Sequence, residues 1–480
     1  MKTKTISTIA LLLCMAWLSS CSNAVSSAAA TPETADPASG ASAETEVTAR
    51  IPIRLFFWVC CDPDLTGLTA VVDDFNASQE NIQLILELPR GDIHTLADVY
   101  ASGDGPDIVG PFGWSVWPNL PVAWLDLTPW IRSEGYDLAQ FPSELVDAYK
   151  TEGQMSLPFV VDPSALFYNT ELFDAAGLEY PPAAYGDTYR MPDGTEVEWT
   201  WDAVRDVARL LTLDDDGKNA ADPGFDGSEI RQYGFTWQYQ NHPNFWGSYW
   251  AEGSMVATGG SKGSYEAQVP DSWRAAWRWT YDAIWGDRPF MGSTEVEGSE
   301  DFGGGNPFDS GKVAMTVVPS WYLCCMQNNH SWDAAALPAY AGLVAGRVEE
   351  STFRIWKETR HPREAFAALT FLLGEGARTL ILGGEDMPGL YANVVPARTA
   401  DQKDWVDAQR ERFPWVQNWD VVLAGLNIPG SAETDTTMPN YKDAWNRGTA
   451  FADLLRGTGG LDLDQEIEKY LNDLAVIFNK

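Results

Sequence analysis

A strand, a helix and a second strand follow one another between residues 51 and 88, and this order restricts the fold more than any other part of the sequence. Residues 51–59 (IPIRLFFWV) and 82–88 (IQLILEL) are β-rich, and the apolar residues from Leu68 to Phe75 repeat at the spacing of a helix. Two strands joined by a helix predict a parallel pair with a right-handed crossover. The folded part is therefore expected to be an α/β protein.

The rest of the chain continues this mixture of helices and strands. Helices are predicted at residues 201–213, 272–284, 362–382 and 463–478, and short strands at residues 107–109, 353–355 and 394–396. The chain has 480 residues, which is more than the roughly 250–300 residues that a single hydrophobic core serves. At least two lobes are expected.

The beginning of the chain has the pattern of an export signal. Lys2 and Lys4 are followed by the apolar residues 9–18, a stretch too short to span a bilayer. The next residues, LSSC at 18–21, resemble the lipobox of bacterial lipoproteins, in which cleavage before the cysteine leaves a new N-terminus that carries lipid. We expect residues 1–20 to be a signal peptide and Cys21 to be lipidated. The alternative is a plain secretory peptide with a bystander cysteine.

Residues 21–50 are predicted to be a flexible tether between this lipid anchor and the folded part. They are rich in Ala, Ser, Thr, Pro and Glu and contain no aromatic residue, so they cannot bury enough apolar area to offset their conformational entropy. A flexible chain of this length reaches about 30 Å from its anchor.

The charge of the chain excludes two classes of partner. With 32 basic and 68 acidic residues, its formal net charge is −36. Such a chain repels nucleic-acid phosphates and an anionic membrane surface. We therefore expect no nucleic-acid partner, and the expected attachment to the membrane is the lipid.

Four stretches of the folded part carry a family resemblance. They are residues 51–58, which end in Trp58, residues 157–173 (LPFVVDPSALFYNTELF), residues 308–321 (FDSGKVAMTVVPSW) and the helix of residues 364–382. They are similar to the extracellular solute-binding proteins of ABC importers, in the sugar-binding branch related to maltose-binding protein. In that family the second stretch crosses between two lobes, and the third delivers an aromatic residue to the sugar. The polar residues 180–198 are a longer insertion than the family pattern has.

The resemblance implies a two-lobed periplasmic-binding-protein type II fold with a hinge and a cleft between the lobes. Residues 51–160 and 333–385 would form the first lobe, and residues 161–332 and 386–480 the second. The implied function is capture of a carbohydrate in this cleft, by a monomer on the outer face of the cell membrane, and delivery to the permease subunits of an ABC transporter. The alternative is a secreted glycoside hydrolase, because acidic, Trp-rich proteins with cleft carboxylates also suit that chemistry.

A sugar site needs aromatic platforms, because sugars present flat C–H faces between their hydroxyl rims. Trp58, Trp114, Trp321 and Tyr322 lie at the ends of predicted strands, where open α/β sheets bind their ligands. They are the expected platforms. The alternative for each tryptophan is packing in the core.

The hydroxyl groups of a sugar need hydrogen-bonding side chains. Asp62 and Asp162 are the candidates, and their alternative role is in a solvated turn or a helix cap. A second aromatic group at residues 237–250, which includes Tyr239, Trp246 and Trp250, is interpreted either as a wall of the cleft or as core.

Four cysteines remain in the folded part: Cys60, Cys61, Cys324 and Cys325. An exported protein favours disulfides over free thiols. Vicinal bridges within each adjacent pair are favoured here, although adjacent Cα atoms lie closer than an unstrained disulfide prefers. Cross-links between the two pairs and free thiols are the alternatives.

The sequence does not predict a metal, a cofactor or a catalytic residue. The four histidines lack the spacing of a zinc site, and no GxSxG nucleophile motif is present. Asp214 to Asp222 form an acidic loop that does not match the EF-hand pattern. This loop is interpreted as a polar loop at a helix end, with a calcium site as the alternative. We therefore expect a binding protein rather than an enzyme.

Overall fold

The computed structural model describes residues 49–59, 65–88, 94–113, 116–120, 122–148, 150, 153–251, 256–258, 261–326, 330–383, 389–428 and 438–480. Residues 49–480 form one compact unit. The predicted signal peptide, Cys21 and the tether up to residue 48 lie outside the described residues.

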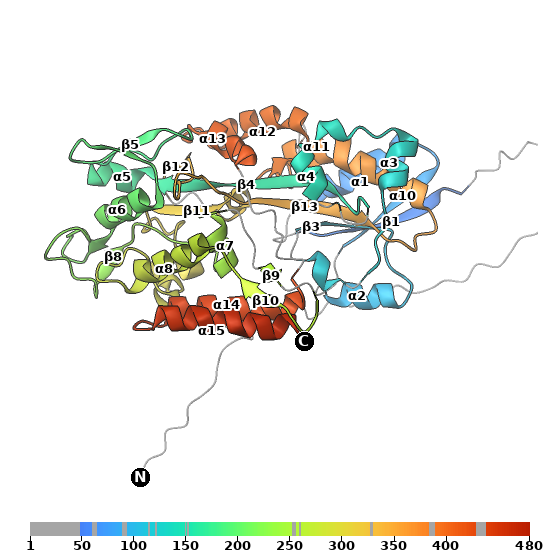
Figure 1. The fold of residues 1–480 in the computed structure, drawn as a ribbon. Helices are drawn as coiled ribbons and strands as arrows, with labels where there is room; N and C mark the ends of the chain where they lie inside the picture. The colour runs from blue at the N-terminus through green and yellow to red at the C-terminus, as the bar shows by residue number, and fades with distance from the viewer. Residues whose placement is uncertain are drawn as a thin grey trace, which may run out of the picture. The chain divides into compact units, whose positions relative to one another are not determined.

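An eight-stranded mixed sheet runs through this unit (Figure 1). Six of the strands lie in the order β11-β4-β13-β3-β1-β2, and two more, β12 and β14, also pair with β4. Their bounds are β1 (Ile51–Phe57), β2 (Ile82–Glu87), β3 (Ile108–Phe112), β4 (Leu157–Asn169), β11 (Met315–Pro319), β12 (Trp332–Ala335), β13 (Val348–Ile355) and β14 (Val395–Pro396). β1 is parallel to β2 and β3, whereas β13 is antiparallel to both β3 and β4.

The predicted strand–helix–strand unit is confirmed. Helix α1 (Thr66–Ser78) connects β1 to the parallel strand β2. It buries the apolar residues Leu68, Val71, Val72 and Phe75 on one face, as their helical spacing requires. The carboxyl ends of β1 and β3 therefore meet at one edge of the sheet, where Trp58 follows β1.

Strand β4 links two hydrophobic cores, and all of its residues are buried. Leu157, Phe159 and Val161 lie in the first core, which surrounds β1, α1 and residues 365–381. Leu166 and Tyr168 lie in the second core, together with the tryptophans of residues 199–277. Residues 157–168 are mostly apolar, as burial on both faces favours, and their buried polar side chains are those of Asp162 and Ser164.

The membership of residues in the two cores can be compared with the predicted lobe boundaries. Buried residues between 394 and 422 pack in the first core, although the predicted second lobe begins at residue 386. Residues 438–478 pack in the second core, on the side that the prediction gives them. The division into lobes stays a prediction.

The helices predicted from periodicity are present. Residues 201–213 correspond to α6, 272–284 to α8, 362–382 to α10 and α11, and 463–478 to α15. The α-helices in the described part of the chain are α1, α2 (His94–Ala101), α3 (Thr128–Glu134), α4 (Ser143–Ala148), α5 (Thr170–Ala176), α6 (Trp201–Leu211), α7 (Pro243–Ser248), α8 (Asp271–Trp285), α9 (Thr294–Glu297), α10 (Pro362–Phe371), α11 (Ala377–Leu382), α12 (Thr399–Arg412), α13 (Trp419–Ala424), α14 (Tyr441–Gly457) and α15 (Leu463–Phe478). A π-helical segment at Leu372–Gly376 joins α10 to α11.

Residues 362–382 are long and apolar enough to cross a membrane by length and composition. In this structure 56% of an apolar stretch of 18 residues within this segment is buried. Phe366, Leu369, Leu373 and Leu380 belong to the first core. Packing against this core accounts for their apolar character.

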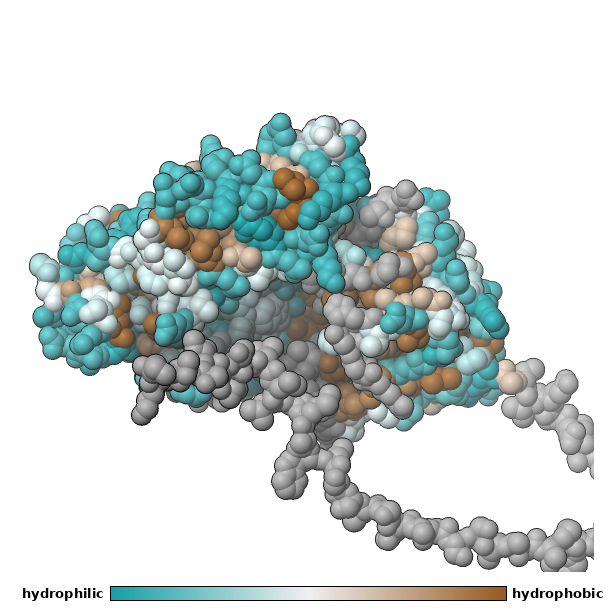
Figure 2. Space-filling model, turned by 90° about the horizontal axis from the view of Figure 1, so that it is seen from below, coloured by the Kyte–Doolittle hydropathy of each residue, from teal (hydrophilic) through white to brown (hydrophobic). Residues whose placement is uncertain are grey.

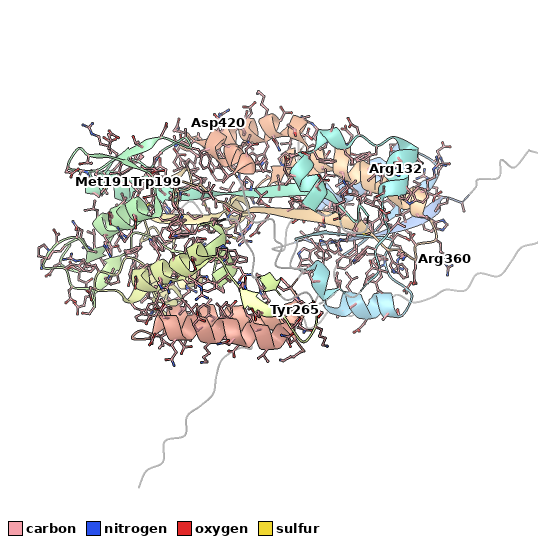
Figure 3. All side chains as sticks on the ribbon, viewed as in Figure 1. Arg132, Met191, Trp199, Tyr265, Arg360 and Asp420 are labelled. Atoms are coloured by element: carbon pink, nitrogen blue, oxygen red, sulfur yellow. The ribbon has the colours of Figure 1, made fainter. Side chains whose placement is uncertain are left out.

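The polar insertion at residues 180–198 folds as a hairpin of β5 (Thr188–Arg190) and β6 (Glu196–Glu198). Tyr189 and the following Trp199 anchor it, with ring centroids 5.2 Å apart, and both rings belong to the second core. Figure 3 places Met191 and Trp199 at the opposite end of the unit from Arg132 and Arg360. The face seen in Figure 2 is mostly hydrophilic with separate small apolar patches, as expected for a strongly acidic chain.

Candidate ligand-binding site

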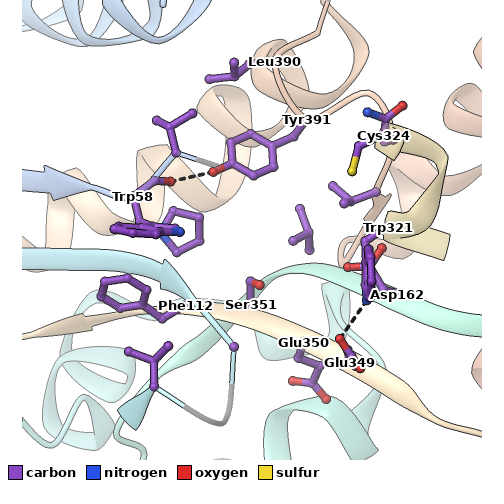
Figure 4. Close-up of a pocket in the computed structure, with 17 residues that line it drawn as sticks. Trp58, Phe112, Asp162, Trp321, Cys324, Glu349, Glu350, Ser351, Leu390 and Tyr391 are labelled. Carbon is purple, nitrogen blue, oxygen red and sulfur yellow. Dashed lines mark hydrogen bonds between the residues drawn. The ribbon is translucent and has the colours of Figure 1, made fainter. Parts of the chain in front are cut away.

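A pocket of about 520 Å³ lies at the carboxyl ends of β1 and β3 and along β4 and β13 (Figure 4). Aromatic and aliphatic side chains make up most of its lining, with three carboxylates, a serine, an asparagine and a thiol. The lining residues are Trp58, Val59, Pro111, Phe112, Gly113, Val116, Val160, Asp162, Trp321, Cys324, Glu349, Glu350, Ser351, Leu390, Tyr391, Asn393 and Val394. Of the predicted contacts, Trp58, Asp162 and Trp321 are thus brought together.

Trp58 and Phe112 form one side of the pocket (Figure 4). Their ring centroids lie 5.9 Å apart. The backbone of Trp58 is held at both ends: its N–H donates to the carbonyl of Gly110 (2.7 Å), and its carbonyl accepts from the hydroxyl of Tyr391 (2.7 Å). Trp58 therefore has a fixed backbone and a half-buried ring that faces the pocket.

Trp321 lies on the opposite side of the pocket (Figure 4). It follows β11 in a short 3-10 helix, Ser320–Cys325, and its ring is half-buried. Its indole Nε1 donates to Oε2 of Glu349 (2.8 Å). Two aromatic sides thus face one another across a space that is large enough for a small ligand.

Carboxylates form the floor of the pocket. Asp162 on β4 lies directly opposite Glu349 on β13 in the strand register. Asp162 is 4% exposed and accepts a hydrogen bond from the hydroxyl of Ser320 (2.9 Å). Burial, and secondly the nearby charge of Glu349, raise the pKa of Asp162 well above its ordinary value.

The pocket lining has no positive charge of its own: among its described residues none is Lys, Arg or His. Its chemistry combines flat aromatic faces with oxygen acceptors and an acidic floor. Such a lining fits an uncharged ligand with hydroxyl groups better than an anion, which the carboxylates would repel.

Three of the predicted contacts are in the core rather than in the pocket, so the structure corrects those predictions. Trp246 and Trp250 are 0% and 2% exposed, and the ring of Trp250 stacks on Trp201 with centroids 3.9 Å apart. Tyr322 is fully buried and donates its hydroxyl to Oδ1 of Asn306 (2.7 Å). For Trp246 and Trp250 the alternative given above, packing in the core, applies. Asp62 and Trp114 lie outside the described residues.

Sequence reasoning missed several residues of the pocket, notably Phe112, Glu349, Glu350 and Tyr391. Phe112 lies at a strand end that the prediction already included, so the same signal applied to it. Glu349 and Tyr391 had no local signal in the sequence. Glu349 reaches the pocket because β13 pairs with β4, and Tyr391 reaches it because a late part of the chain comes back to Trp58.

The described cysteine pair lies at the rim of the pocket. Cys324 and Cys325 are both thiols in this structure, with their sulfur atoms 3.0 Å apart. The hydrogen bond from Cys324 lowers the pKa of Cys325 to about 7. The favoured vicinal bridge is not formed between these two residues here, and Cys60 and Cys61 lie outside the described residues. The pairing of the four cysteines therefore stays a prediction.

The acidic loop after α6 uses its carboxylates to hold its own backbone. Asp214 accepts from the N–H groups of Lys218 (2.8 Å) and Asp226 (2.9 Å), and Asp222 accepts from the N–H of Asn219 (3.1 Å). These bonds explain the acidic residues as turn-stabilising groups. Within the described ranges, no group of three or more His, Cys, Asp or Glu side chains is arranged to hold a metal ion.

Solved structures with the same fold are numerous. An ABC substrate-binding protein from Listeria monocytogenes, in complex with cycloalternan, superposes with a TM-score of 0.61 at 17% identity, over 90% of this chain and 98% of that one. The cyclic α-maltosyl-1,6-maltose binding protein from Arthrobacter globiformis superposes with a TM-score of 0.63 at 15% identity, over 90% of this chain and 100% of that one. UspC from M. tuberculosis superposes with a TM-score of 0.62 at 20% identity, over 89% of this chain and 100% of that one. These likenesses confirm the predicted two-lobed solute-binding fold.

Sequence comparison agrees with this fold. No curated protein sequence matches the chain. The family model of the bacterial extracellular solute-binding proteins, however, matches residues 62–379, which include α1, β4, β11 and most of the α10–α11 helix. Because this match spans well over half of the chain, the protein belongs to the bacterial extracellular solute-binding proteins.

Proposed function

We propose that this protein captures a carbohydrate in the pocket between Trp58 and Trp321 and delivers it to the permease of an ABC importer. The observation that carries the proposal is the pairing of two aromatic sides with an acidic floor and no lining cation among the described residues. Aromatic rings stack on the C–H faces of a sugar, and carboxylates and amides bind its hydroxyl groups.

The size of the pocket favours a short carbohydrate. Its volume of about 520 Å³ lies within the range of sites for small molecules. Among the solved structures with this fold, one is in complex with cycloalternan, one is a cyclic α-maltosyl-1,6-maltose binding protein, and a third was solved with mannotriose bound. An oligosaccharide or a monosaccharide is therefore the proposed ligand class.

Attachment to the membrane is part of the proposal. The lipobox-like residues 18–21 and the tether that follows support export, lipidation at Cys21 and display on the outer face of the cell membrane. A monomer on a tether of this reach suits capture of a solute near a permease.

A thermal-shift screen of the folded protein against mono-, di- and trisaccharides tests the proposal. A true ligand at one hundred times its Kd stabilises the native state by about 2.7 kcal/mol, which raises the unfolding temperature. The panel should contain glucose, maltose, maltotriose, mannobiose, mannotriose and cellobiose. Absence of any shift across neutral sugars would contradict the proposal.

The same samples separate binding from hydrolysis. A binding protein returns its sugar unchanged, whereas a glycoside hydrolase releases reducing ends. We expect no increase in reducing sugar after prolonged incubation with any sugar that shifts the unfolding temperature.

A further inference from the structure

We infer that Glu349 is a positioning residue that sets the orientation of the Trp321 ring toward the pocket, within a closed circuit of contacts that also includes Arg347, Gln240 and Tyr239. The inference rests on the proposed function, because that function makes Trp321 a platform for the ligand. None of these four residues was singled out for such a role by its sequence context.

The first contact of the circuit is at the edge of the indole. Nε1 is the only polar atom of a tryptophan side chain, and in Trp321 it donates to Oε2 of Glu349 (2.8 Å). A hydrogen bond to a carboxylate at this point selects one rotation of the ring about its side-chain torsions. Glu349 itself lines the pocket, so its position determines how the ring is presented there.

The second contact fixes Glu349. Its other oxygen, Oε1, accepts from Nη2 of Arg347 (3.0 Å), whose side chain is 3% exposed. The guanidinium of Arg347 also lies over the ring of Phe245, 3.6 Å from the centroid. A buried guanidinium that is stacked and ion-paired in this way has little freedom to move, so it anchors the carboxylate that holds Trp321.

The third contact leads from Arg347 back toward Trp321. Nη1 of Arg347 donates to Oε1 of Gln240 (3.1 Å), a side chain that is 1% exposed. The same oxygen accepts from the hydroxyl of Tyr249 (3.3 Å). Gln240 is thus held from two sides, and its neighbour in the chain is Tyr239.

Tyr239 closes the circuit. Its ring is nearly parallel to that of Trp321, with an interplanar angle of 21° and centroids 6.2 Å apart. Its backbone has φ of +57°, which a tyrosine rarely adopts and which costs conformational energy. Although it is 40% exposed, this strained residue places its ring beside Trp321. Trp321 is therefore restrained by a hydrogen bond at its edge and by an aromatic neighbour.

The consequence of the circuit is preorganisation. A ring whose orientation is set before the ligand arrives does not lose further rotamer freedom on binding, so more of the contact free energy appears as affinity. The restraint acts on the ring itself, so it affects any ligand that stacks on Trp321.

A spectroscopic experiment tests the inference without a ligand. The indole 1H–15N signal of Trp321 is assigned by its loss in Trp321→Phe, and its position and hydrogen exchange are then followed in variants. Glu349→Leu removes the acceptor and should shift the signal and speed exchange by at least about tenfold, as loss of a hydrogen bond to a charged group would. Glu349→Gln retains an acceptor oxygen and should keep the signal close to the wild-type position. Glu350→Gln, at the next residue of the same strand, is the matched control and should leave the signal unchanged.

A second variant covers the case in which Glu349→Leu fails to fold because Arg347 loses its partner. Arg347→Met/Glu349→Leu removes both charges together, which a protein tolerates better than one unpaired buried charge. It should shift the Trp321 signal as Glu349→Leu would. A wild-type signal in a folded protein that lacks Glu349, or an equal shift in the glutamine and leucine variants, would overturn the inference.

The effect on binding is measured separately with maltotriose and mannotriose. For whichever trisaccharide binds the wild-type protein, Glu349→Leu should weaken affinity by about tenfold and Glu349→Gln by less. The loss should be smaller in a Trp321→Ala background, because the part of the effect that Glu349 exerts through that ring is then absent. If neither trisaccharide nor any other sugar binds, the proposed function fails, while the indole signals still decide the positioning role.

Discussion

Two tryptophans of this protein illustrate opposite uses of the same side chain. Trp321 is half-buried beside the pocket, whereas Trp246 is fully buried in the second core. Trp321→Ala should weaken sugar binding by about 2–3 kcal/mol, because stacking and burial against the ligand are lost, with a smaller effect on unfolding. Calorimetry of binding and denaturant unfolding on the same sample measure both quantities.

Trp246→Ala is the matched control for that prediction. Truncation of a buried tryptophan should cost about 3–5 kcal/mol of stability and leave the affinity of the folded protein nearly unchanged. If Trp321→Ala collapses the fold, or leaves affinity intact, Trp321 is not the platform and Trp58 takes that role.

Asp162 predicts a pH dependence of stability. Burial raises its pKa in the folded state above the ordinary value of 3.8, so the native protein holds a proton that the unfolded chain releases. The contribution of Asp162 to the free energy of unfolding should therefore fall as pH rises above about 4, until the raised pKa is passed. Asp162→Asn removes this proton exchange. The free energy of unfolding of the wild type minus that of the variant should therefore decrease as the pH rises.

Denaturant unfolding from pH 4 to pH 8 measures this difference for the two proteins side by side. Asp162→Asn should be the more stable relative to wild type at the upper end of the range. A difference that stays constant with pH would show that Asp162 has an ordinary pKa in the folded protein.

At the scale of elements, the edge of the pocket depends on a close approach of β3 to β13. Gly110 has φ of +142°, and a Cβ atom there would lie 2.6 Å from the carbonyl oxygen of Thr352 and 2.8 Å from Phe353. Gly110→Ala should therefore cost about 1–3 kcal/mol of stability, through backbone strain and overlap. Urea unfolding measures the loss.

Gly113, three residues further along, provides the control because its Cβ would lie 3.7 Å from the nearest atom, an ordinary contact. Gly113→Ala should change the free energy of unfolding by much less. Equal effects of the two substitutions would argue against a special close approach at Gly110.

The 3-10 helix after β11 brings two thiols together at the pocket rim. The Cys324 and Cys325 sulfur atoms are 3.0 Å apart, close enough to react with one another when an oxidant is present. We expect the exported protein to contain vicinal bridges, Cys60 to Cys61 and Cys324 to Cys325. Peptide mapping under non-reducing conditions checks this, and a peptide that joins either residue of the first pair to the second pair would exclude it.

At the scale of the whole molecule, the chain is expected to be held at the membrane by lipid on Cys21. Cys21→Ala should prevent lipidation, so the folded protein should appear in the soluble fraction after export. Fractionation of cells that express the wild type and the variant, with detection of the folded part, measures the change. Mature Cys21→Ala protein that stays with the membrane would show that another part of the chain attaches it.

The sequence by itself determined the elements whose signals are local. The apolar spacing of residues 68–75, 201–211 and 463–478 placed helices because one buried face repeats every 3.6 residues in any environment. The motifs around residues 157–173 and 308–321 indicated the solute-binding fold. Strand ends then pointed to Trp58 and Trp321, because loops that leave a sheet edge gather there.

Only the tertiary structure decided which aromatic residues are exposed to the pocket. Tyr322 follows the same strand as Trp321, and Trp246 and Trp250 stand in a dense aromatic group, yet all three are buried, because burial depends on which distant elements cover a ring. The sequence indicated Asp162 but not the carboxylate of Glu349 beside it. Glu349 faces Asp162 only because β13 returns antiparallel to β4 in one register, and a shift of β13 by one residue would turn Glu349 to the other face.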